Sequence, residues 1–178
     1  MNKPALPLSL HPAPGGQARA MIGAFIAMPW RDKLTLLAAW LLIGVLALGL
    51  RLFGFRPIAR LLGTPAGTNA FIPLISDHQA RRARLVMRAV RRAARIAPSR
   101  SDCLPQVLTG AVLCRLLGVP TTAFLGVRLA ASPAITAHAW LCAGPVPVTG
   151  GSSFGDYAVT LCFAAPLAAP ALRQDRAA

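Results

Sequence analysis

The sequence predicts an α+β fold, in which a helical N-terminal part packs on a core made of one helix and a small antiparallel sheet. Two long segments ahead of Pro98 have helical character: an apolar run over 34–50 and an amphipathic, arginine-rich stretch over 77–97. After Pro98 the pattern changes to one helix, 103–117, followed by several short segments typical of strands. One helix followed by a run of adjacent strands is the α+β pattern.

The 178 residues are enough for one domain with a hydrophobic core. Residues 1–16 are rich in proline and are expected to form a disordered tail, and residues 166–178 a flexible one. Between the tails we expect a helical region over 17–97 and a core region over 98–165.

The first helical elements are predicted around a proline. Residues 17–30 could form a short helix, and Pro29 followed by Asp32 predicts the start of a longer one, since proline fits a first turn and an acid favours the positive end of the helix dipole. The apolar run Leu34–Leu50 then spans about 25 Å as a helix, the lower limit for crossing a bilayer. This length favours a helix that is buried or lies on a membrane surface, with a membrane-spanning helix as the alternative.

A second long helix follows a linker rich in glycine, proline and threonine over 63–69. Ser76 or Asp77 is expected to cap this helix, which ends near Ala97 before Pro98. Apolar residues recur with helical spacing on one face, and arginines occupy another. The arginine face is either a solvated surface or a docking site for a peptide or for phosphates.

The C-terminal part begins with a helix over Cys103–Leu117, and Gly118 is expected to be its left-handed cap. Strands are predicted over 121–127, 135–142 and 157–163, with a turn region rich in proline and glycine between the last two.

The charge is strongly unbalanced: 19 Lys and Arg stand against 5 acidic residues, which gives a net charge of +14. All five acids are aspartates, so any catalytic carboxylate comes from this set: Asp32, Asp77, Asp102, Asp156 and Asp175. The excess of arginine reflects either an anionic partner or a coding bias towards arginine. Nucleic-acid binding is not expected, because no aromatic residues interleave the arginine clusters and no nucleic-acid motif is present.

Residues 1–16 do not resemble a signal peptide, since prolines interrupt their short apolar run. We therefore expect a cytoplasmic protein with reduced thiols, associated with membranes only if 34–50 is membrane-active. The four cysteines lack the spacing of a zinc site, so no metal is expected.

Cys103 is the candidate nucleophile. Pro105 suits the first turn of a helix, which places Cys103 at the helix start, where unpaired N–H groups favour the thiolate. The other three thiols have apolar neighbours and are expected to be buried and structural: Cys114, Cys142 and Cys162.

His138 is the candidate base. Of the three histidines, His11 lies in the predicted tail, His78 in the first turn of the arginine-rich helix, and His138 in the middle of a predicted strand. A cysteine at a helix start and a histidine on an adjoining strand form a nucleophile–base pair in many enzymes. Spacing alone does not separate this hypothesis from a histidine that is part of the core.

Four stretches, taken in order, carry a family resemblance: Ser101-Asp-Cys-Leu-Pro-Gln106, Arg115-Leu-Leu-Gly-Val-Pro120, Phe124-Leu-Gly-Val-Arg128 and Ala137-His-Ala-Trp-Leu141. They resemble the lasso-peptide biosynthesis B proteins, which are leader peptidases with a transglutaminase-like, papain-like cysteine protease core. The resemblance covers residues 20–163. It implies that the cysteine lies on a helix and the histidine on the sheet that follows.

The resemblance implies a Cys-His-Asp triad. Cys103 and His138 match by position, but the stretch 148–151, where the family's acid usually lies, reads Val-Thr-Gly-Gly. Asp156 is the nearest candidate for the third member, and a dyad or a backbone carbonyl that orients the histidine are the open alternatives. Gln106, together with backbone N–H groups near Cys103, is the candidate for stabilising the oxyanion.

The resemblance also implies partners: a lasso precursor peptide, a separate leader-recognition protein and a macrolactam synthetase. No cofactor is evident and no nucleotide-binding motif is present, so an ATP requirement rests on the resemblance alone. We therefore expect an ATP-linked or ATP-independent cysteine peptidase that removes the leader from a ribosomally made lasso-peptide precursor before macrolactam closure. Two alternatives stay open: a small basic, non-enzymatic assembly protein anchored in a membrane by 34–50, and an acyltransferase that uses the same Cys/His pair.

Overall fold

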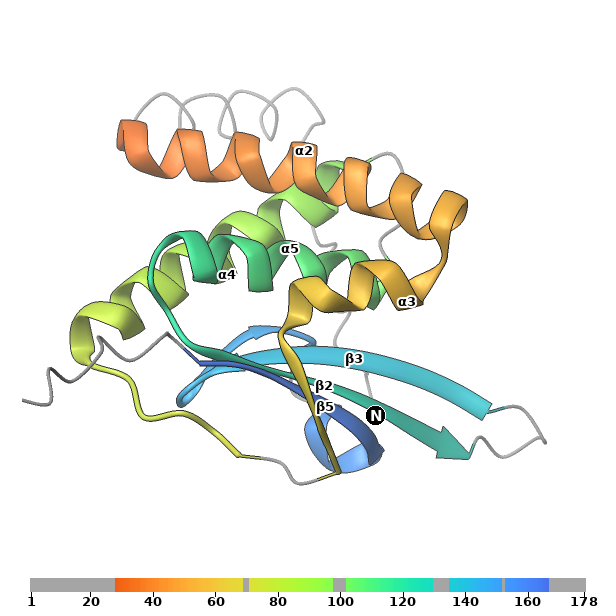
Figure 1. The fold of residues 1–178 in the computed structure, drawn as a ribbon. Helices are drawn as coiled ribbons and strands as arrows, with labels where there is room; N and C mark the ends of the chain where they lie inside the picture. The colour runs from red at the N-terminus through yellow and green to blue at the C-terminus, as the bar shows by residue number, and fades with distance from the viewer. Residues whose placement is uncertain (1–27, 69–70, 98–101, 130–134, 152, 167–178) are drawn as a thin grey trace, which may run out of the picture.

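The computed structural model describes residues 28–68, 71–97, 102–129, 135–151 and 153–166. Within them, helices cover one face of a five-stranded antiparallel sheet, with strand order β1-β5-β2-β3-β4 (Figure 1). Helices α4 and α5 lie on the sheet, and α2 lies over these two helices. The predicted α+β class is confirmed. The two predicted tails lie outside the described residues apart from Pro166, as does the short helix predicted over 17–30 up to residue 27.

Helix α2 (Trp30–Phe53) begins where the sequence predicts. Pro29 is its N-cap and Asp32 lies in the first turn, where a carboxylate favours the helix dipole. The helix ends at Gly54, whose φ of 75° is a left-handed conformation that glycine adopts without strain. Two short elements then lead to the sheet: α3 (Phe55–Ile58) and the 3₁₀ turn η1 (Ala59–Leu62).

The segment predicted as a linker over 63–69 contains an edge strand, β1 (Thr64–Gly67), that pairs with β5. Glycine and proline are rare in strands, so the composition of this segment does not predict a strand. Gly63 explains part of this composition: its φ is 114°, and a Cβ there would overlap the carbonyl oxygen of Ala164. Glycine is therefore needed where the chain enters the sheet.

Helix α4 (Asp77–Ile96) confirms the predicted amphipathic, arginine-rich helix. Ser76 caps it in a capping box, in which the Ser76 hydroxyl accepts from the Gln79 backbone N–H and the Gln79 side chain accepts from the Ser76 N–H. Its buried residues are all alanine or valine, which allows close packing: Ala80, Ala83, Val86, Ala89, Val90 and Ala93.

The C-terminal half forms helix α5 (Cys103–Leu116) and the rest of the sheet, and Gly118 has the predicted left-handed φ of 67°. The three predicted strands are present as β2 (Thr121–Leu129), β3 (Ile135–Ala143) and β5 (Ala158–Ala165). The predicted turn region also contains a strand, β4 (Val146–Thr149), and a 3₁₀ turn, η2 (Ser153–Asp156). β4 lies at the sheet edge, where a proline such as Pro147 is tolerated.

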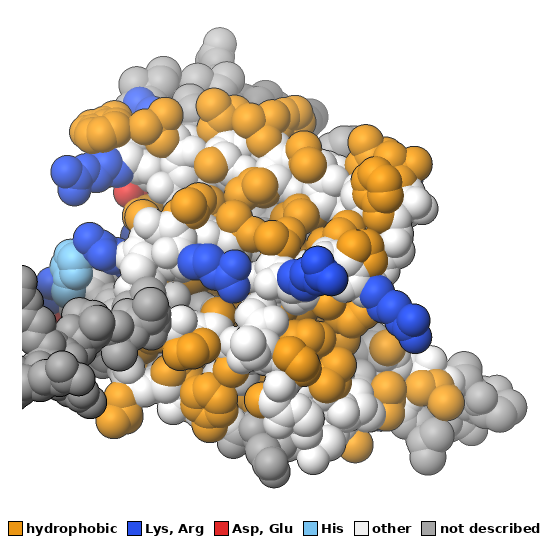
Figure 2. Space-filling view, in the orientation of Figure 1, with side chains coloured by type: hydrophobic (Ala, Val, Ile, Leu, Met, Phe, Trp, Pro, Cys, Tyr) orange, Lys and Arg blue, Asp and Glu red, His pale blue; other side chains and the backbone are white. Residues whose placement is uncertain are grey.

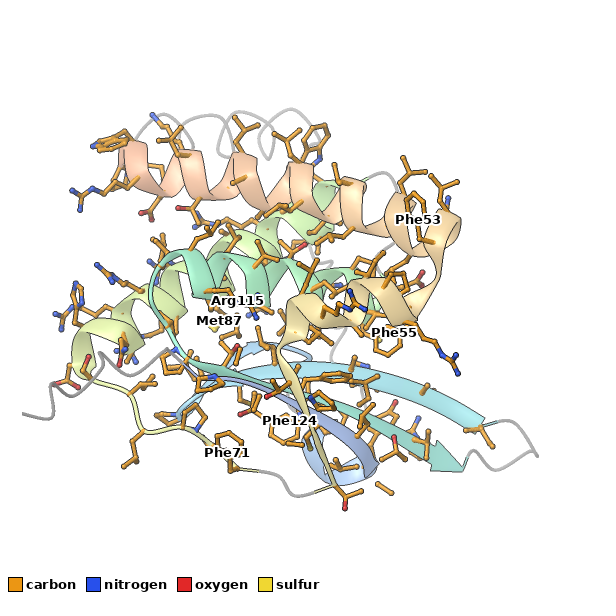
Figure 3. All side chains as sticks on the ribbon, in the orientation of Figure 1. Phe53, Phe55, Phe71, Met87, Arg115 and Phe124 are labelled. Carbon is orange, nitrogen blue, oxygen red and sulfur yellow. The ribbon has the colours of Figure 1, made fainter. Side chains whose placement is uncertain are left out.

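Hydrophobic side chains fill both sides of the sheet. The main core lies between the sheet and the helices and includes Ala139 and Leu141 of β3. A smaller cluster lies on the opposite face and consists of Phe124, Trp140, Cys142 and Cys162. Figure 3 shows Phe124 on the side of the sheet away from the helices. Successive residues of β3 therefore point alternately to the helices and away from them.

Helix α2 has two apolar faces. One packs into the main core through Ala39, Ile43 and Leu46. The other exposes large apolar side chains along the whole helix, which Figure 2 shows as a hydrophobic band: Trp30, Leu34, Leu37, Trp40, Leu41, Val45, Leu48, Leu52 and Phe53. Among the described residues, α2 alone is long and apolar enough to cross a membrane, a test that the core helix of a soluble protein also passes.

Candidate active site

Cys103 is the first residue of α5 and is partly buried. The N-cap residue, Asp102, makes no side-chain capping hydrogen bond to the helix. The first N–H groups of α5, which have no carbonyl partner one turn earlier, are therefore not satisfied by this carboxylate. This is the local arrangement that can stabilise an oxyanion formed beside Cys103.

A cavity of about 310 Å³ is lined by Asp102 and Leu104, the two sequence neighbours of Cys103, although Cys103 itself is not part of its wall. The end of α2 and the start of α3 form the opposite wall, which is mostly apolar. The lining residues are Ala47, Leu50, Arg51, Phe55, Asp102, Leu104 and Pro105. The cavity is large enough for one or two side chains of a bound peptide and presents one cationic and one acidic side chain to them, Arg51 and Asp102.

His138 lies on β3 opposite Gly126 of β2. Its Nε2 is 3.2 Å from the carbonyl oxygen of Gly150, which follows β4. A carbonyl only accepts, so this hydrogen bond places the proton on Nε2 and leaves Nδ1 as the acceptor. The ring also stacks on Trp140 and contacts Tyr157, with centroid distances of 5.9 and 5.2 Å. The imidazole is thus held in one orientation.

The starts of α5 and β3 lie at the same end of the sheet (Figure 1). The connection of α5 to β2 is short and β3 is antiparallel to β2, so α5 and β3 run in the same direction. Gly110 of α5 lies against Leu141 of β3. Cys103 precedes Gly110, and His138 precedes Leu141, by about 10 Å each. The two candidates are therefore level with each other along the sheet.

The two side chains nevertheless lie on different faces of the sheet. Leu141 points to α5, so strand alternation points His138 to the opposite face, with Trp140. Within the described part of the chain, no hydrogen bond joins Cys103 to His138. A direct proton transfer between them would need a water relay or a rearrangement of the first residues of β3.

The two remaining candidate residues lie on different elements, Asp156 on η2 and Gln106 on α5. Asp156 ends η2, is exposed, and makes no ion pair or hydrogen bond to His138 among the described residues. Its neighbour Tyr157 contacts the imidazole instead. Gln106 lies one turn after Cys103 on α5 and is half-buried.

The other three thiols are buried, as predicted: Cys114, Cys142 and Cys162. Burial raises the pKa of the Cys114 thiol to about 12 and that of the Cys142 thiol to about 11. The pKa of Cys162 is also raised by burial. These thiols are therefore protonated at neutral pH, and Cys103 is the only cysteine that is not buried.

The sequence left a backbone carbonyl open as the group that orients His138, but it did not identify Gly150 or Tyr157 as neighbours of the imidazole. Gly150 and Gly151 indicate a turn, and both have positive φ, of 91° and 65°. A Cβ on Gly150 would overlap Trp140. Glycine is therefore needed at position 150 because the loop lies close to β3. A turn predicted from the two glycines does not indicate this contact.

A helix that begins with a partly exposed cysteine, followed by an antiparallel sheet that bears a histidine, defines a class of cysteine-dependent α+β proteins. Residues 44–162 match the family described as the transglutaminase-like superfamily, and the chain belongs to this superfamily. Its members are generally cysteine-dependent enzymes, and such a domain indicates peptidase or acyltransferase chemistry. Neither the curated proteins nor the solved structures contain a significant match.

Proposed function

We propose that this protein is a cysteine peptidase that removes the leader from a ribosomally made lasso-peptide precursor before macrolactam closure. The observation that carries the proposal is the position of Cys103, the one unburied thiol, at the start of α5, where Asp102 provides no side-chain cap and both sequence neighbours of Cys103 line a cavity. The motifs around Cys103 and His138 that resemble the lasso-peptide B proteins supply the substrate class.

In the proposed reaction the Cys103 thiolate attacks the carbonyl carbon of the leader–core amide. The N–H groups at the start of α5, with Gln106 as a further donor, stabilise the oxyanion of the tetrahedral intermediate. The C–N bond then breaks, and the leaving amine takes a proton from the protonated base, which is His138. Water then attacks the thioester carbonyl and gives one proton to the base; the C–S bond breaks to restore the Cys103 thiolate, and the leader leaves as a carboxylate, with its proton released to solvent.

The base reaches this chemistry through Nδ1, because Nε2 is engaged with Gly150. Since His138 lies on the other face of β3, the proposal requires that substrate binding moves the first residues of β3 or orders a relaying water. The side chains of residues 135–137 are exposed, but these residues pair with β2, so a movement would break this strand pairing, whereas a relaying water would leave it intact.

The same two residues would also support acyl transfer, in which an amine replaces water in the second step. The proposed partners are the precursor peptide, a separate leader-recognition protein and a macrolactam synthetase. Whether ATP is required is part of the proposal to be tested.

The test is cleavage of a precursor peptide by the purified full chain, with its recognition protein, followed by mass spectrometry. Two cleavage products from the wild-type protein and none from Cys103→Ala would support the proposal. Cleavage by Cys103→Ala at the wild-type rate would overturn it. Added ATP and an added amine acceptor, in separate reactions, distinguish ATP-linked hydrolysis and acyl transfer from simple hydrolysis.

A further inference from the structure

A basic groove lies between the start of α2 and the first half of α4, away from the candidate active site. It has a volume of about 670 Å³. Four arginines and one aspartate line it, an excess of three positive charges: Arg31, Arg81, Arg82, Arg88 and Asp32. Leucines from three helices or their ends form apolar parts of the wall: Leu34, Leu85 and Leu117.

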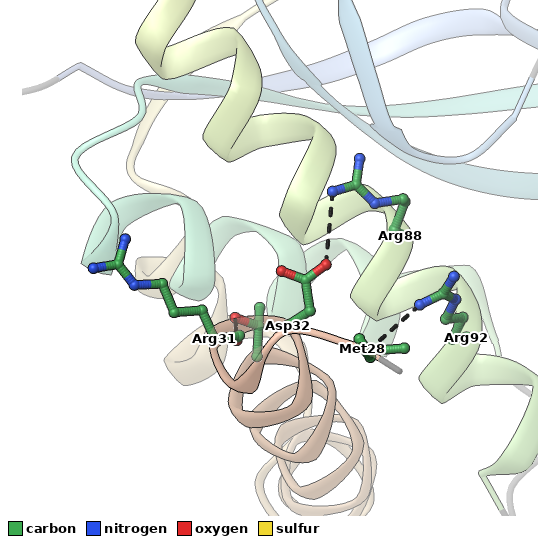
Figure 4. Close-up of polar contacts among 6 residues, drawn as sticks. Met28, Arg31, Asp32, Arg88 and Arg92 are labelled. Atoms are coloured by element: carbon green, nitrogen blue, oxygen red, sulfur yellow. Dashed lines mark hydrogen bonds and ion pairs between the residues drawn. The ribbon is translucent and has the colours of Figure 1, made fainter. Parts of the chain in front are cut away.

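Three of the arginines are held in place by neighbours. The Arg88 guanidinium is 3.9 Å from the Asp32 carboxylate (Figure 4), and Arg82 donates to the Leu117 carbonyl at 2.7 Å. The Arg31 guanidinium lies over the Trp30 ring, 5.6 Å from its centroid. Each guanidinium has five N–H donors, so these contacts leave donors for a ligand, and the short hydrogen bond of Arg82 restricts that side chain the most. Prior ordering lowers the entropic cost of binding.

Arg81 is exposed, and among the described residues it makes no hydrogen bond or ion pair. Figure 2 shows basic side chains gathered beside the start of α2. Since one aspartate faces four arginines, the groove is complementary to an anionic ligand.

The shape favours a peptide segment over a flat or compact anion. His78 and Arg88 mark the ends of the groove on α4 and lie about 15 Å apart along the helix. An extended chain covers this length with four or five residues. A lipid surface is flat and would not fill the groove, and a single phosphate would not contact its leucines.

We propose that this groove binds an acidic segment of the peptide substrate, with carboxylates on the arginines and apolar side chains on the leucines. This proposal rests on the proposed function for the identity of the substrate. Leu117, in the groove wall, follows the C-terminal end of α5, and Cys103 is at the other end, about 20 Å away. The acidic segment must therefore be separated from the cleaved bond by about six extended residues or more.

The test measures binding separately from cleavage, with the full chain carrying Cys103→Ala. The probe is a fluorescein-labelled ten-residue peptide of alternating Glu and Leu, and its control replaces each Glu by Gln. Fluorescence anisotropy should show binding of the Glu peptide at low salt, weakened at least tenfold for the Gln peptide.

Matched variants then locate the site. Arg81→Gln with Arg88→Gln removes two groove charges, while Arg91→Gln with Arg95→Gln removes two charges from the same helix outside the groove. The groove pair should weaken binding about fivefold or more and the control pair less than twofold. If the groove pair lowers the melting temperature, the single variant Arg81→Gln replaces it in the binding measurement. Arg81 makes no hydrogen bond or ion pair among the described residues, so its loss should not destabilise the fold.

Equal weakening by the two pairs would overturn the proposal, as would equal binding of the Glu and Gln peptides. So would binding to vesicles that contain phosphatidylserine without binding to the peptide, which would identify a lipid surface as the partner. Loss of peptide binding in the groove pair, with no cleavage by the wild-type protein, would support the groove and reject the proposed function. The two proposals can therefore fail separately.

Discussion

The Nε2 atom of His138 lies 3.2 Å from the carbonyl oxygen of Gly150, twelve residues further along the chain. This is the stretch where the resemblance leads one to expect an aspartate, and the sequence has Val-Thr-Gly-Gly instead. The backbone carbonyl can fix the tautomer and the ring orientation as a carboxylate would. It carries no full charge, so it stabilises the imidazolium less than a carboxylate does.

We expect Gly150→Ala to disturb this contact and to destabilise the protein by about 2 kcal/mol or more, because a Cβ would overlap Trp140 and the φ of 91° disfavours alanine. Gly151→Ala is the matched control. Its φ of 65° is also positive, but its Cβ would meet nothing within 4 Å, so a loss of about 1 kcal/mol is expected. Urea unfolding measures both. Equal losses would show that the approach to Trp140 is not tight.

If Gly150 orients His138, Asp156→Ala should cleave precursor within about fivefold of the wild-type rate, while His138→Ala should lose at least about a hundredfold. Asp156 is exposed and has no contact with the imidazole among the described residues. Single-turnover cleavage, with saturating recognition protein, makes the comparison. A loss of about 10- to 1000-fold in Asp156→Ala, with leader binding unchanged, would make Asp156 the third triad member, as the sequence predicts.

Cys103 should be alkylated first by limiting iodoacetamide at neutral pH. Burial raises the pKa of Cys114 to about 12 and of Cys142 to about 11, so their thiolate populations at pH 7 are negligible, and both are also inaccessible. Peptide mapping by mass spectrometry gives the order of labelling. Full labelling of all four thiols after unfolding in urea is the control. Modification of a buried cysteine ahead of Cys103 would contradict the assignment of the nucleophile.

The raised thiol pKa values predict a loss of stability at alkaline pH. An unfolded thiol ionises around its ordinary pKa of 9.0, whereas the folded Cys114 thiol remains protonated up to about 12. The unfolded state therefore binds fewer protons in this window, and stability falls as pH rises, by about 1.4 kcal/mol per pH unit for each such thiol. Below about pH 8 these thiols contribute almost no slope, because they are protonated in both states.

Urea unfolding at pH 7, 8, 9, 10 and 10.5 tests this dependence. Cys114→Ala will be less stable at every pH because of the cavity that it leaves, but its slope above pH 9 should be smaller. An unchanged slope would mean that Cys114 ionises in the folded state as readily as in the unfolded one.

Helix α2 should not behave as a membrane-spanning segment, because Ala39 and Ile43 are fully buried in the main core. We expect alkaline carbonate to release the protein from a membrane fraction. Ile43→Ala should destabilise it by about 1–4 kcal/mol, while Val45→Ala, on the exposed face, should change stability by less than about 0.5 kcal/mol. Retention after carbonate, together with no effect of Ile43→Ala, would favour a spanning helix.

The amino-acid sequence was sufficient to predict the elements whose start depends on a few adjacent residues. Pro29 and Asp32 predict the start of α2, and the Ser76 capping box predicts the start of α4, because caps depend on a few adjacent residues. The helix-start position of Cys103 was predicted for the same reason. Apolar neighbours correctly predicted the burial of the other three cysteines.

Features that depend on pairing between distant segments of the chain could not be predicted from the sequence. β1 is a strand because β5 offers it hydrogen-bonding partners, although its proline, alanine and glycine have little preference for strands. β4 contains strand-forming valines and a threonine, but Pro147 and the nearby glycines favour a turn, so its pairing with β3 decided the outcome. The face of the sheet on which His138 lies depends on the register of β3. Leu141, three residues after His138 in the sequence, packs against α5, so His138 points to the opposite face. The groove between α2 and α4 likewise depends on how two helices far apart in sequence pack together, so an arginine pattern on one helix could not show whether its surface is flat or concave.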